Sequence, residues 1–91
     1  MSHIATSQAD GHADSLTERM YALIADALDV MRLDVLPGYL LRDDLGADDA
    51  DIDRLRRMID RTLGCYVTVE DAAAWREVAD VVGYVARRMG A

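Results

Sequence analysis

The sequence predicts an all-α domain, and two observations support this fold class. The first is composition: 52% of the 91 residues are apolar, yet there are only four Tyr, one Trp and no Phe. The core must therefore be aliphatic and Met-rich, which suits helices better than a β-sandwich. The second is periodicity, because apolar residues recur at intervals of three and four along most of the chain. A chain of this length makes one small domain.

Residues 1–14 are polar and show no apolar period, so we predict a flexible tail there and a helical domain over residues 15–91. The first helix is expected to begin at Ser15, because S15-L-T-E18 has the form of a capping box ahead of an apolar run. The residues predicted to face inward from this helix are Leu16, Met20, Leu23, Ile24, Ala27 and Leu28.

The connection over residues 29–48 is long and contains many apolar side chains around the pair Pro37-Gly38. Such a segment is predicted to fold over the core and not to act as a free linker. Its apolar residues are Val30, Leu33, Val35, Leu36, Tyr39, Leu40, Leu41 and Leu45.

A second helix is predicted from Asp49 to Leu63, and Gly64 supplies a left-handed stop. An extended piece over Cys65–Val69 follows, then a turn or short helix near Glu70–Ala74. The inner face of the second helix is predicted to consist of Ile52, Leu55, Ile59, Thr62 and Leu63.

The last helix is predicted over Arg76–Arg88, with Arg87 and Arg88 at the end where the helix dipole favours cations. Trp75 is expected to pack over the edge of the core, and contact with a partner or ligand is the alternative. The inward residues of this helix are predicted to be Val78, Val81, Val82, Val85 and Met89.

Charge and residue usage exclude several classes of function. The net charge of −7 argues against nucleic acid and anionic membranes as partners. No apolar run approaches the roughly 18 residues of a membrane span, and the amino terminus lacks a signal-peptide apolar region, so a cytoplasmic location is expected. We also expect a monomer. Cys65 is the single cysteine, and His3 and His12 lie far from any partner. No disulfide, metal site or histidine-based catalysis is predicted.

The strongest motif is D44-L45-G46-A47-D48, which directly precedes the second predicted helix. Together with Glu18-Arg19, Val30, Val35 and the final Val78, Tyr84 and Val85, it makes residues 16–85 resemble a bacterial acyl carrier protein. The resemblance implies a four-helix bundle with a long loop between the first two helices and a short third helix. It also implies an apolar interior that can hold an acyl chain. We expect no enzymatic activity, because the predicted folded part has no histidine and no carboxylate pair with a sign of burial.

In that family a serine directly after this motif carries 4′-phosphopantetheine, and Asp49 stands at its position here, followed by Ala50 in place of a leucine. The resemblance implies that the phosphodiester lies at the helix amino terminus, beside free N–H groups and the positive end of the dipole. Asp49 has no hydroxyl, so no cofactor is expected on this chain. Its carboxylate is expected to cap the helix.

The second predicted helix also departs from the family, whose members use an acidic face to dock on basic patches of enzymes. Residues 49–63 contain four Asp and four Arg, and Arg54 and Arg61 stand where the resemblance implies Glu. One interpretation is a solvated helix with pairs such as Asp53–Arg57 and Arg57–Asp60. The other is a re-specified docking surface on this helix and the preceding loop. Its predicted contacts are Asp48, Asp51, Arg54, Arg57 and Arg61.

Three functions therefore stay open. The first is an interaction module without phosphopantetheine, bound by an enzyme of fatty acid- or polyketide-type biosynthesis. The second is a working acyl or aminoacyl carrier whose serine at position 49 is changed to Asp in this chain. The third is a bundle that holds a free fatty acid, although no inward polar residue marks a head-group site. An EF-hand is not predicted, because Arg54 stands where the calcium loop needs Gly.

Overall fold

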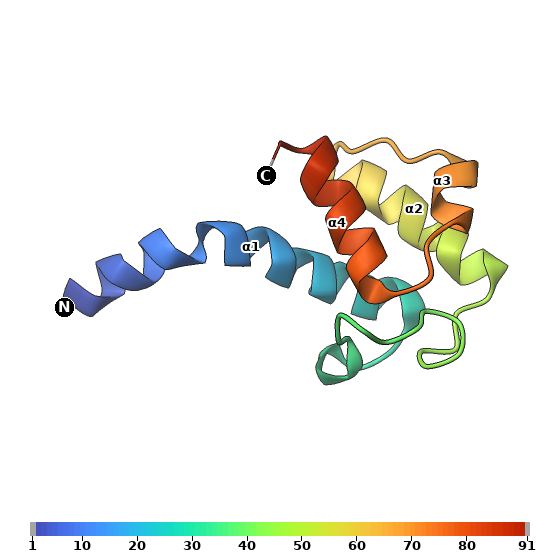
Figure 1. Cartoon of the computed structure of the whole chain (residues 1–91), viewed down its shortest axis with the longest axis horizontal. Coiled ribbons are helices and arrows are strands. Elements are labelled where there is room, and N and C mark those ends of the chain that lie inside the picture. Colours follow the sequence, from blue (N-terminus) through green and yellow to red (C-terminus); the bar gives the residue numbers. More distant parts are fainter. Residues whose placement is uncertain (1, 91) are drawn as a thin grey trace.

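The computed structural model describes the backbone of residues 2–90 and the side chains of residues 15–90, and over this range it contains four α-helices and no strand. The all-α prediction is confirmed. The helix α1 packs against α2 and α4, and the short α3 packs against α2 (Figure 1). The elements are α1 (Ser2–Leu28), the 3₁₀ helix η1 (Arg32–Asp34), α2 (Asp49–Leu63), α3 (Val69–Ala73) and α4 (Val78–Arg88).

The helix α1 begins at Ser2 and not at Ser15, so the prediction of its start is wrong. The predicted capping box lies inside a continuous helix. Residues 2–14 contain no proline and several alanines, so helical backbone formed farther along the chain can continue through them without a new nucleation step. Figure 1 shows this half of α1 projecting away from the other helices. The predicted flexibility of residues 1–14 stays a prediction.

The core lies where α1, α2 and α4 meet, and it is aliphatic as predicted. Thr62 and Met89 were predicted to face inward, but both are exposed. Thr62 lies in the last turn of α2 and Met89 follows α4. The fully buried large side chains are Met20, Ile24, Val35, Leu41, Leu55, Ile59, Val67, Val78, Val81 and Val85.

The end of α1 is fixed by a Schellman motif with Asp29 at its left-handed position, where φ is 57°. The N–H of Val30 donates to the carbonyl of Ala25 at 3.0 Å, and that of Asp29 donates to Asp26 at 3.3 Å. Aspartate enters the left-handed region more readily than most residues other than glycine. The chain therefore turns into the loop at a defined point.

The loop over residues 29–48 covers the core with only part of its apolar side chains. Val35, Leu41 and Leu45 are buried, but Leu33 is 81% exposed, and Leu36 and Tyr39 also face solvent. For these three exposed residues the prediction of a core-covering loop is wrong. The helix η1 has no buried residue, so the local turn itself directs Leu33 outward.

Backbone hydrogen bonds tie this loop to the start of α4, and we call this set the loop–α4 bridge. The N–H of Leu41 donates to Arg76 at 2.9 Å, that of Val78 donates to Tyr39 at 3.0 Å, and that of Ala79 donates to Pro37 at 2.9 Å. The first N–H groups of a helix have no partner within it. The loop–α4 bridge supplies acceptors for two of them and places the loop across the end of the bundle.

The helix boundaries follow local capping signals. The helix α2 has the predicted bounds, and Gly64 is left-handed with φ of 66°. The helix α4 begins at Val78 and not at Arg76, because the Asp80 carboxylate accepts the backbone N–H groups of Arg76 and Glu77, each at 2.9 Å. These two residues are thereby held outside the helix. Within residues 2–90, no helix has both the length and the apolar character that crossing a bilayer requires.

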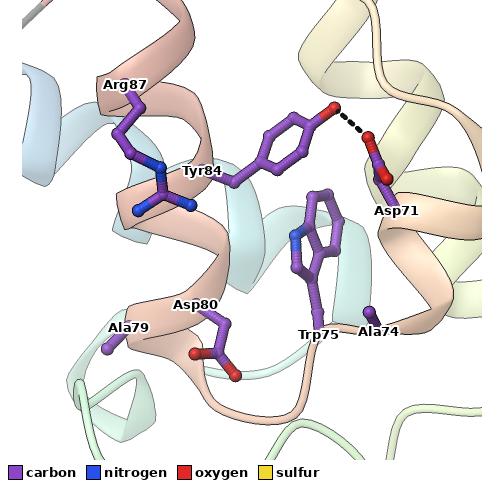
Figure 2. A pocket seen from close by; sticks show the side chains of 7 residues that line it. All are labelled: Asp71, Ala74, Trp75, Ala79, Asp80, Tyr84 and Arg87. Atoms are coloured by element: carbon purple, nitrogen blue, oxygen red, sulfur yellow. Dashed lines mark hydrogen bonds between the residues drawn. The ribbon is translucent and has the colours of Figure 1, made fainter.

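The connection between α3 and α4 places Trp75 at the edge of the core, as predicted. Trp75 is 6% exposed, and its ring meets the Tyr84 ring edge to face, with centroids 5.6 Å apart. The Tyr84 hydroxyl donates to the Asp71 carboxylate at 2.9 Å, which joins α4 to α3 (Figure 2). The indole is therefore held between two fixed neighbours.

Candidate functional site

The start of α2 is closed by two aspartates that cap each other. Asp48 has extended backbone and accepts the N–H of Asp51 at 2.8 Å, and Asp51 accepts the N–H of Asp48 at 3.1 Å. This is a capping box built from carboxylates. The expectation that Asp49 caps the helix is wrong, because the cap is Asp48 and Asp49 is the first helical residue.

Asp49 instead points into solvent at the beginning of α2. Its side chain is 95% exposed, and its Oδ1 accepts from Nη2 of Arg42 at 2.8 Å. Arg42 is placed by a tight turn in which the N–H of Gly46 donates to the Arg42 carbonyl at 3.0 Å. A carboxylate here is favoured by the positive end of the α2 dipole, while the exposed ion pair itself contributes little.

A pocket of about 320 Å³ lies between α2 and α3, beside Asp49. The pairs Arg42–Asp49 and Asp53–Arg56 contribute charged side chains to its lining. Its apolar lining consists of Ile52, Val69, Ala72 and Ala73. The arrangement offers space for a small apolar group next to the exposed carboxylate.

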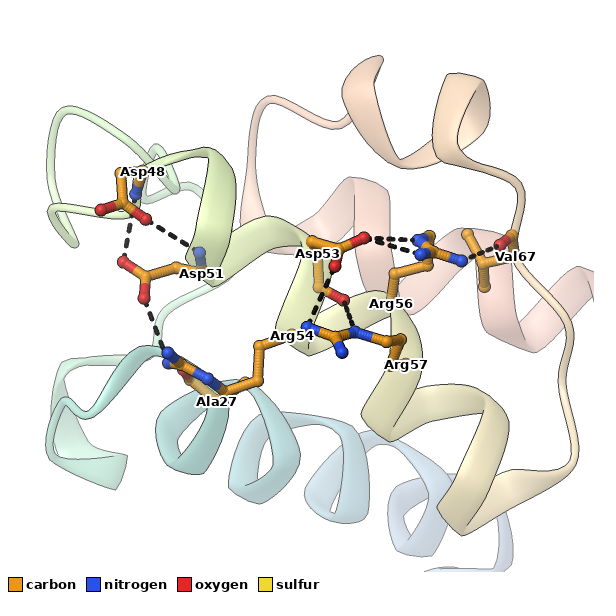
Figure 3. A network of polar contacts seen from close by, with 8 residues as sticks. All are labelled: Ala27, Asp48, Asp51, Asp53, Arg54, Arg56, Arg57 and Val67. Carbon is orange, nitrogen blue, oxygen red and sulfur yellow. Dashed lines mark hydrogen bonds and ion pairs between the residues drawn. The ribbon is translucent and has the colours of Figure 1, made fainter.

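Three of the arginines on α2 form ion pairs with aspartates of the same helix (Figure 3). The Asp53 carboxylate accepts from Arg56 at 2.6 Å and forms an ion pair with Arg57 at 3.0 Å. The predicted pair Asp53–Arg57 is confirmed. Among the side chains described, Arg57 does not pair with Asp60, so that prediction is wrong, because Asp53 already holds its guanidinium.

Arg54 fastens α2 to α1. Its Nη1 donates to the carbonyl of Ala27 at 2.8 Å and lies 3.1 Å from Oδ1 of Asp51 (Figure 3). The carbonyl of Ala27 is among the last four of α1, which lack partners within the helix. Arg54 therefore supplies a partner for a helix end and cannot be counted as a free surface charge.

Comparison with known proteins places this geometry in a family. No family model matches the chain. The chain is 30% identical over 76 residues to an acyl carrier protein of Solidesulfovibrio magneticus. The aligned region covers 84% of this chain and 97% of that protein. The chain belongs to the acyl carrier protein family. The family resemblance drawn from the D-L-G-A-D motif and the flanking residues is thereby confirmed, and the four α-helices agree with it.

In this acyl carrier protein family member, the structure separates the five predicted partner contacts into two groups. Asp48, Asp51 and Arg54 are engaged in caps and in the joint between α1 and α2. Arg57 pairs with Asp53 but is 64% exposed, and Arg61 is exposed with no ion pair within residues 15–90. Asp48 and Arg54 are also exposed, so what distinguishes Arg57 and Arg61 is that, among the described side chains, neither is engaged in a cap or in a bond between helices.

Neither a metal site nor a cysteine nucleophile is supported in the described part of this acyl carrier protein family member. No group of three or more His, Cys, Asp or Glu within it could hold a metal ion. Cys65 is buried, and burial raises the pKa of its thiol, so the thiolate that would act as nucleophile is disfavoured.

Removing the Arg54 side chain is expected to loosen the α1–α2 joint. In Arg54→Ala the Ala27 carbonyl loses its donor, and the free energy of unfolding should fall by about 1 kcal/mol. Urea denaturation measures this. Arg61→Ala removes the same charge from a side chain that has no ion pair or hydrogen bond within residues 15–90, so its midpoint should stay close to that of the parent. Equal losses in the two variants would contradict the anchoring role of Arg54.

Hydrogen bonds hold three aspartate pKa values below their ordinary range. The backbone N–H of Asp51 lowers the pKa of Asp48, and the Arg56 guanidinium lowers that of Asp53. The two N–H groups ahead of α4 do the same for Asp80. The ionised form of each carboxyl is therefore favoured in the folded state.

These shifts predict loss of stability in acid. A pKa lower in the folded than in the unfolded state stabilises the fold above the unfolded value of about 3.9, and this contribution disappears as the pH falls through the folded value. Urea midpoints should therefore be level near neutrality and drop below about pH 4. Asp48→Asn should flatten the drop, and a curve parallel to that of the parent would argue against a contribution from Asp48.

Proposed function

We propose that this acyl carrier protein family member is an interaction module that carries no phosphopantetheine and is bound by an enzyme of fatty acid- or polyketide-type biosynthesis. The observation that carries the proposal is Asp49, which stands where the resemblance implies the attachment serine. Its carboxylate is exposed and held by Arg42. Attack by a carboxylate on coenzyme A would give an acyl phosphate, which hydrolyses readily and makes no lasting tether. The module is non-enzymatic, cytoplasmic and monomeric.

The proposed docking surface combines α2 with the loop over residues 29–48. The loop contains five Asp and two Arg, and both arginines are paired, Arg32 with Glu18 and Arg42 with Asp49. The loop also exposes Met31 and Leu33, which are 69% and 81% accessible. The five contacts proposed on α2 and its cap are Asp48, Asp51, Arg54, Arg57 and Arg61.

This distribution of charge specifies the partner. The acidic loop with its apolar side chains suits an apolar contact bordered by Lys or Arg, and the outward cations on α2 suit acidic side chains. A partner with a uniformly basic patch would be repelled by Arg57 and Arg61. The partner surface is therefore expected to be mixed in charge.

Intact mass tests the absence of the cofactor. The chain is incubated with a broad-specificity phosphopantetheinyl transferase, coenzyme A and Mg²⁺, beside an acyl carrier protein that has its serine. The native chain should keep its mass while the comparison protein gains one phosphopantetheine group. A gain on the native chain would overturn the proposal.

Charge reversal tests the docking surface. The double variant Arg57→Glu/Arg61→Glu should capture about tenfold less of the native biosynthetic partner in a pull-down, since two attractive contacts become repulsive. Arg19→Glu makes the same kind of change on α1 and should leave capture unaltered. Unchanged capture by the double variant would show that α2 is not the docking face.

One observation supports the alternative, a working acyl or aminoacyl carrier changed from Ser to Asp at position 49. The pocket between α2 and α3 lies directly beside this position, where a tethered group could enter it. The codon at position 49 in the source genome separates the two functions. A serine codon supports the carrier, and an aspartate codon supports the interaction module.

A further inference from the structure

The indole of Trp75 presents a buried donor that the protein leaves unpaired. Nε1 is buried and has no hydrogen-bond partner within the described residues. Trp75 as a whole is 6% exposed. Buried N–H groups are nearly always paired, because an unpaired one loses its bonds to water without replacement. Because protein atoms cover Nε1, an acceptor from outside can reach it only after a neighbouring side chain moves.

A pocket of about 340 Å³ adjoins the Trp75 side chain. Figure 2 shows the indole nitrogen turned toward the space between the Asp80 and Arg87 side chains, away from Asp71. The hydroxyl of Tyr84 is already used on Asp71. The lining consists of Asp71, Ala74, Trp75, Ala79, Asp80, Tyr84 and Arg87. We call this space the indole pocket, and it shares no lining residue with the pocket beside Asp49.

The charges around the indole pocket favour a neutral ligand. Asp80 and Arg87 contribute one negative and one positive charge, and Asp71 is paired with Arg88 at 3.4 Å, so neither sign is in excess around the pocket. A charged ligand would therefore gain little attraction here to offset its loss of water. Nor can the start of α4 attract an anion with the N–H groups of Arg76 and Glu77, because Oδ2 of Asp80 accepts both.

The groups left available are complementary to an amide. Trp75 offers an N–H donor, and Asp80 keeps its second oxygen, Oδ1, which has no partner among the hydrogen bonds of residues 15–90. Arg87 forms no ion pair within the same residues. Its guanidinium lies over Gly83, where an added Cβ would be 3.4 Å from Nη1. As an exposed side chain, Arg87 can move aside to admit a ligand.

We infer that the indole pocket binds a neutral amide, whose carbonyl accepts from Nε1 of Trp75 and whose N–H donates to Oδ1 of Asp80. This binding does not depend on Asp49 or on the docking surface on α2, so it stands or falls separately from the proposed function. A ligand of about ten non-hydrogen atoms that fills such an open pocket would have a dissociation constant on the order of millimolar.

The single tryptophan provides the test, because a ¹⁵N-labelled chain has one indole N–H resonance. Titration with the neutral diamide N-acetylalanine N′-methylamide should shift this resonance along a saturable curve. Acetate serves as a small anion, and tert-butanol serves as an uncharged molecule without an amide. Neither should give a saturable shift of the indole resonance. Absence of a saturable shift with the diamide, or equal saturation with acetate or tert-butanol, would overturn the inference.

Two alanine variants localise the site. Ala79 is exposed and lines the pocket, so Ala79→Leu fills the space without removing a polar group. Ala50→Leu places the same side chain on the exposed start of α2. The diamide should lose its saturable effect on the indole resonance in Ala79→Leu and keep it in Ala50→Leu. A shift retained in Ala79→Leu, with helical content unchanged by circular dichroism, would show that the diamide binds elsewhere.

Discussion

Replacing Asp49 by Ser is expected to convert this chain from one that gains no phosphopantetheine into one that gains a full equivalent. The side chain at position 49 begins α2 and is 95% exposed, so a hydroxyl there would be open to attack the pyrophosphate of coenzyme A. The phosphodiester formed would lie at the positive end of the helix dipole, and loss of the carboxylate would leave Arg42 free to contact it. Intact mass after incubation with the transferase measures the change.

A serine placed one residue earlier provides the control. Asp48 is the cap of α2 and accepts the N–H of Asp51. In Asp48→Ser the hydroxyl would take over that bond and face the helix, so this variant should stay unmodified. Modification of both variants would mean that the transferase requires a hydroxyl near the start of α2 but not at one particular position. Failure of Asp49→Ser would show that the surrounding surface, and not the missing hydroxyl alone, prevents modification.

Truncating Leu55 is expected to remove a large share of the stability of the fold. Leu55 lies in the middle of α2 and is 0% exposed, and replacing such a side chain by Ala costs about 3 kcal/mol through lost burial and the remaining cavity. A domain of this size has a free energy of unfolding of roughly 5–14 kcal/mol. Leu55→Ala should therefore shift the urea midpoint strongly downward and, at the lower end of this range, leave a measurable unfolded fraction in buffer.

Thr62→Ala is the matched change on the same helix. Thr62 is exposed, and surface substitutions of this kind usually stay within about 0.5 kcal/mol of the parent. Similar midpoints for Leu55→Ala and Thr62→Ala would mean that the core is not organised around α2 as the structure places it.

Features of the fold that are set by residues adjacent in the sequence could be predicted from the sequence. The end of α2 is set by Gly64, which adopts the left-handed conformation that the stop requires. The start of α1 could not be predicted in the same way, because residues 2–14 contain no proline and the helix continues through Gly11. Asp48 and Asp49 are chemically equal candidates for the cap, and only the extended backbone at Asp48 distinguishes them.

The candidate site was predictable in position but not in its contacts. The motif before α2 located the exposed residue at position 49 from the sequence. The bonds of Arg54 to Ala27 and of Arg42 to Asp49 join segments whose approach depends on how the helices pack and how the loop turns. For the same reason, nothing in the sequence indicated that Arg54, assigned there to a partner surface, also donates to the end of α1.

The loop–α4 bridge has a consequence for the order in which the chain folds. Bonds within helices and contacts between helices that follow one another close short segments and form early. The bridge joins the loop to residues beyond α2 and α3, so its closure waits until those helices have assembled. The amides of Leu41, Val78 and Ala79 are then expected to become protected from hydrogen exchange later in refolding than the amides within the helices. Opening of the bridge need not unfold any helix, so we expect the loop to have a local opening equilibrium of its own, distinct from global unfolding.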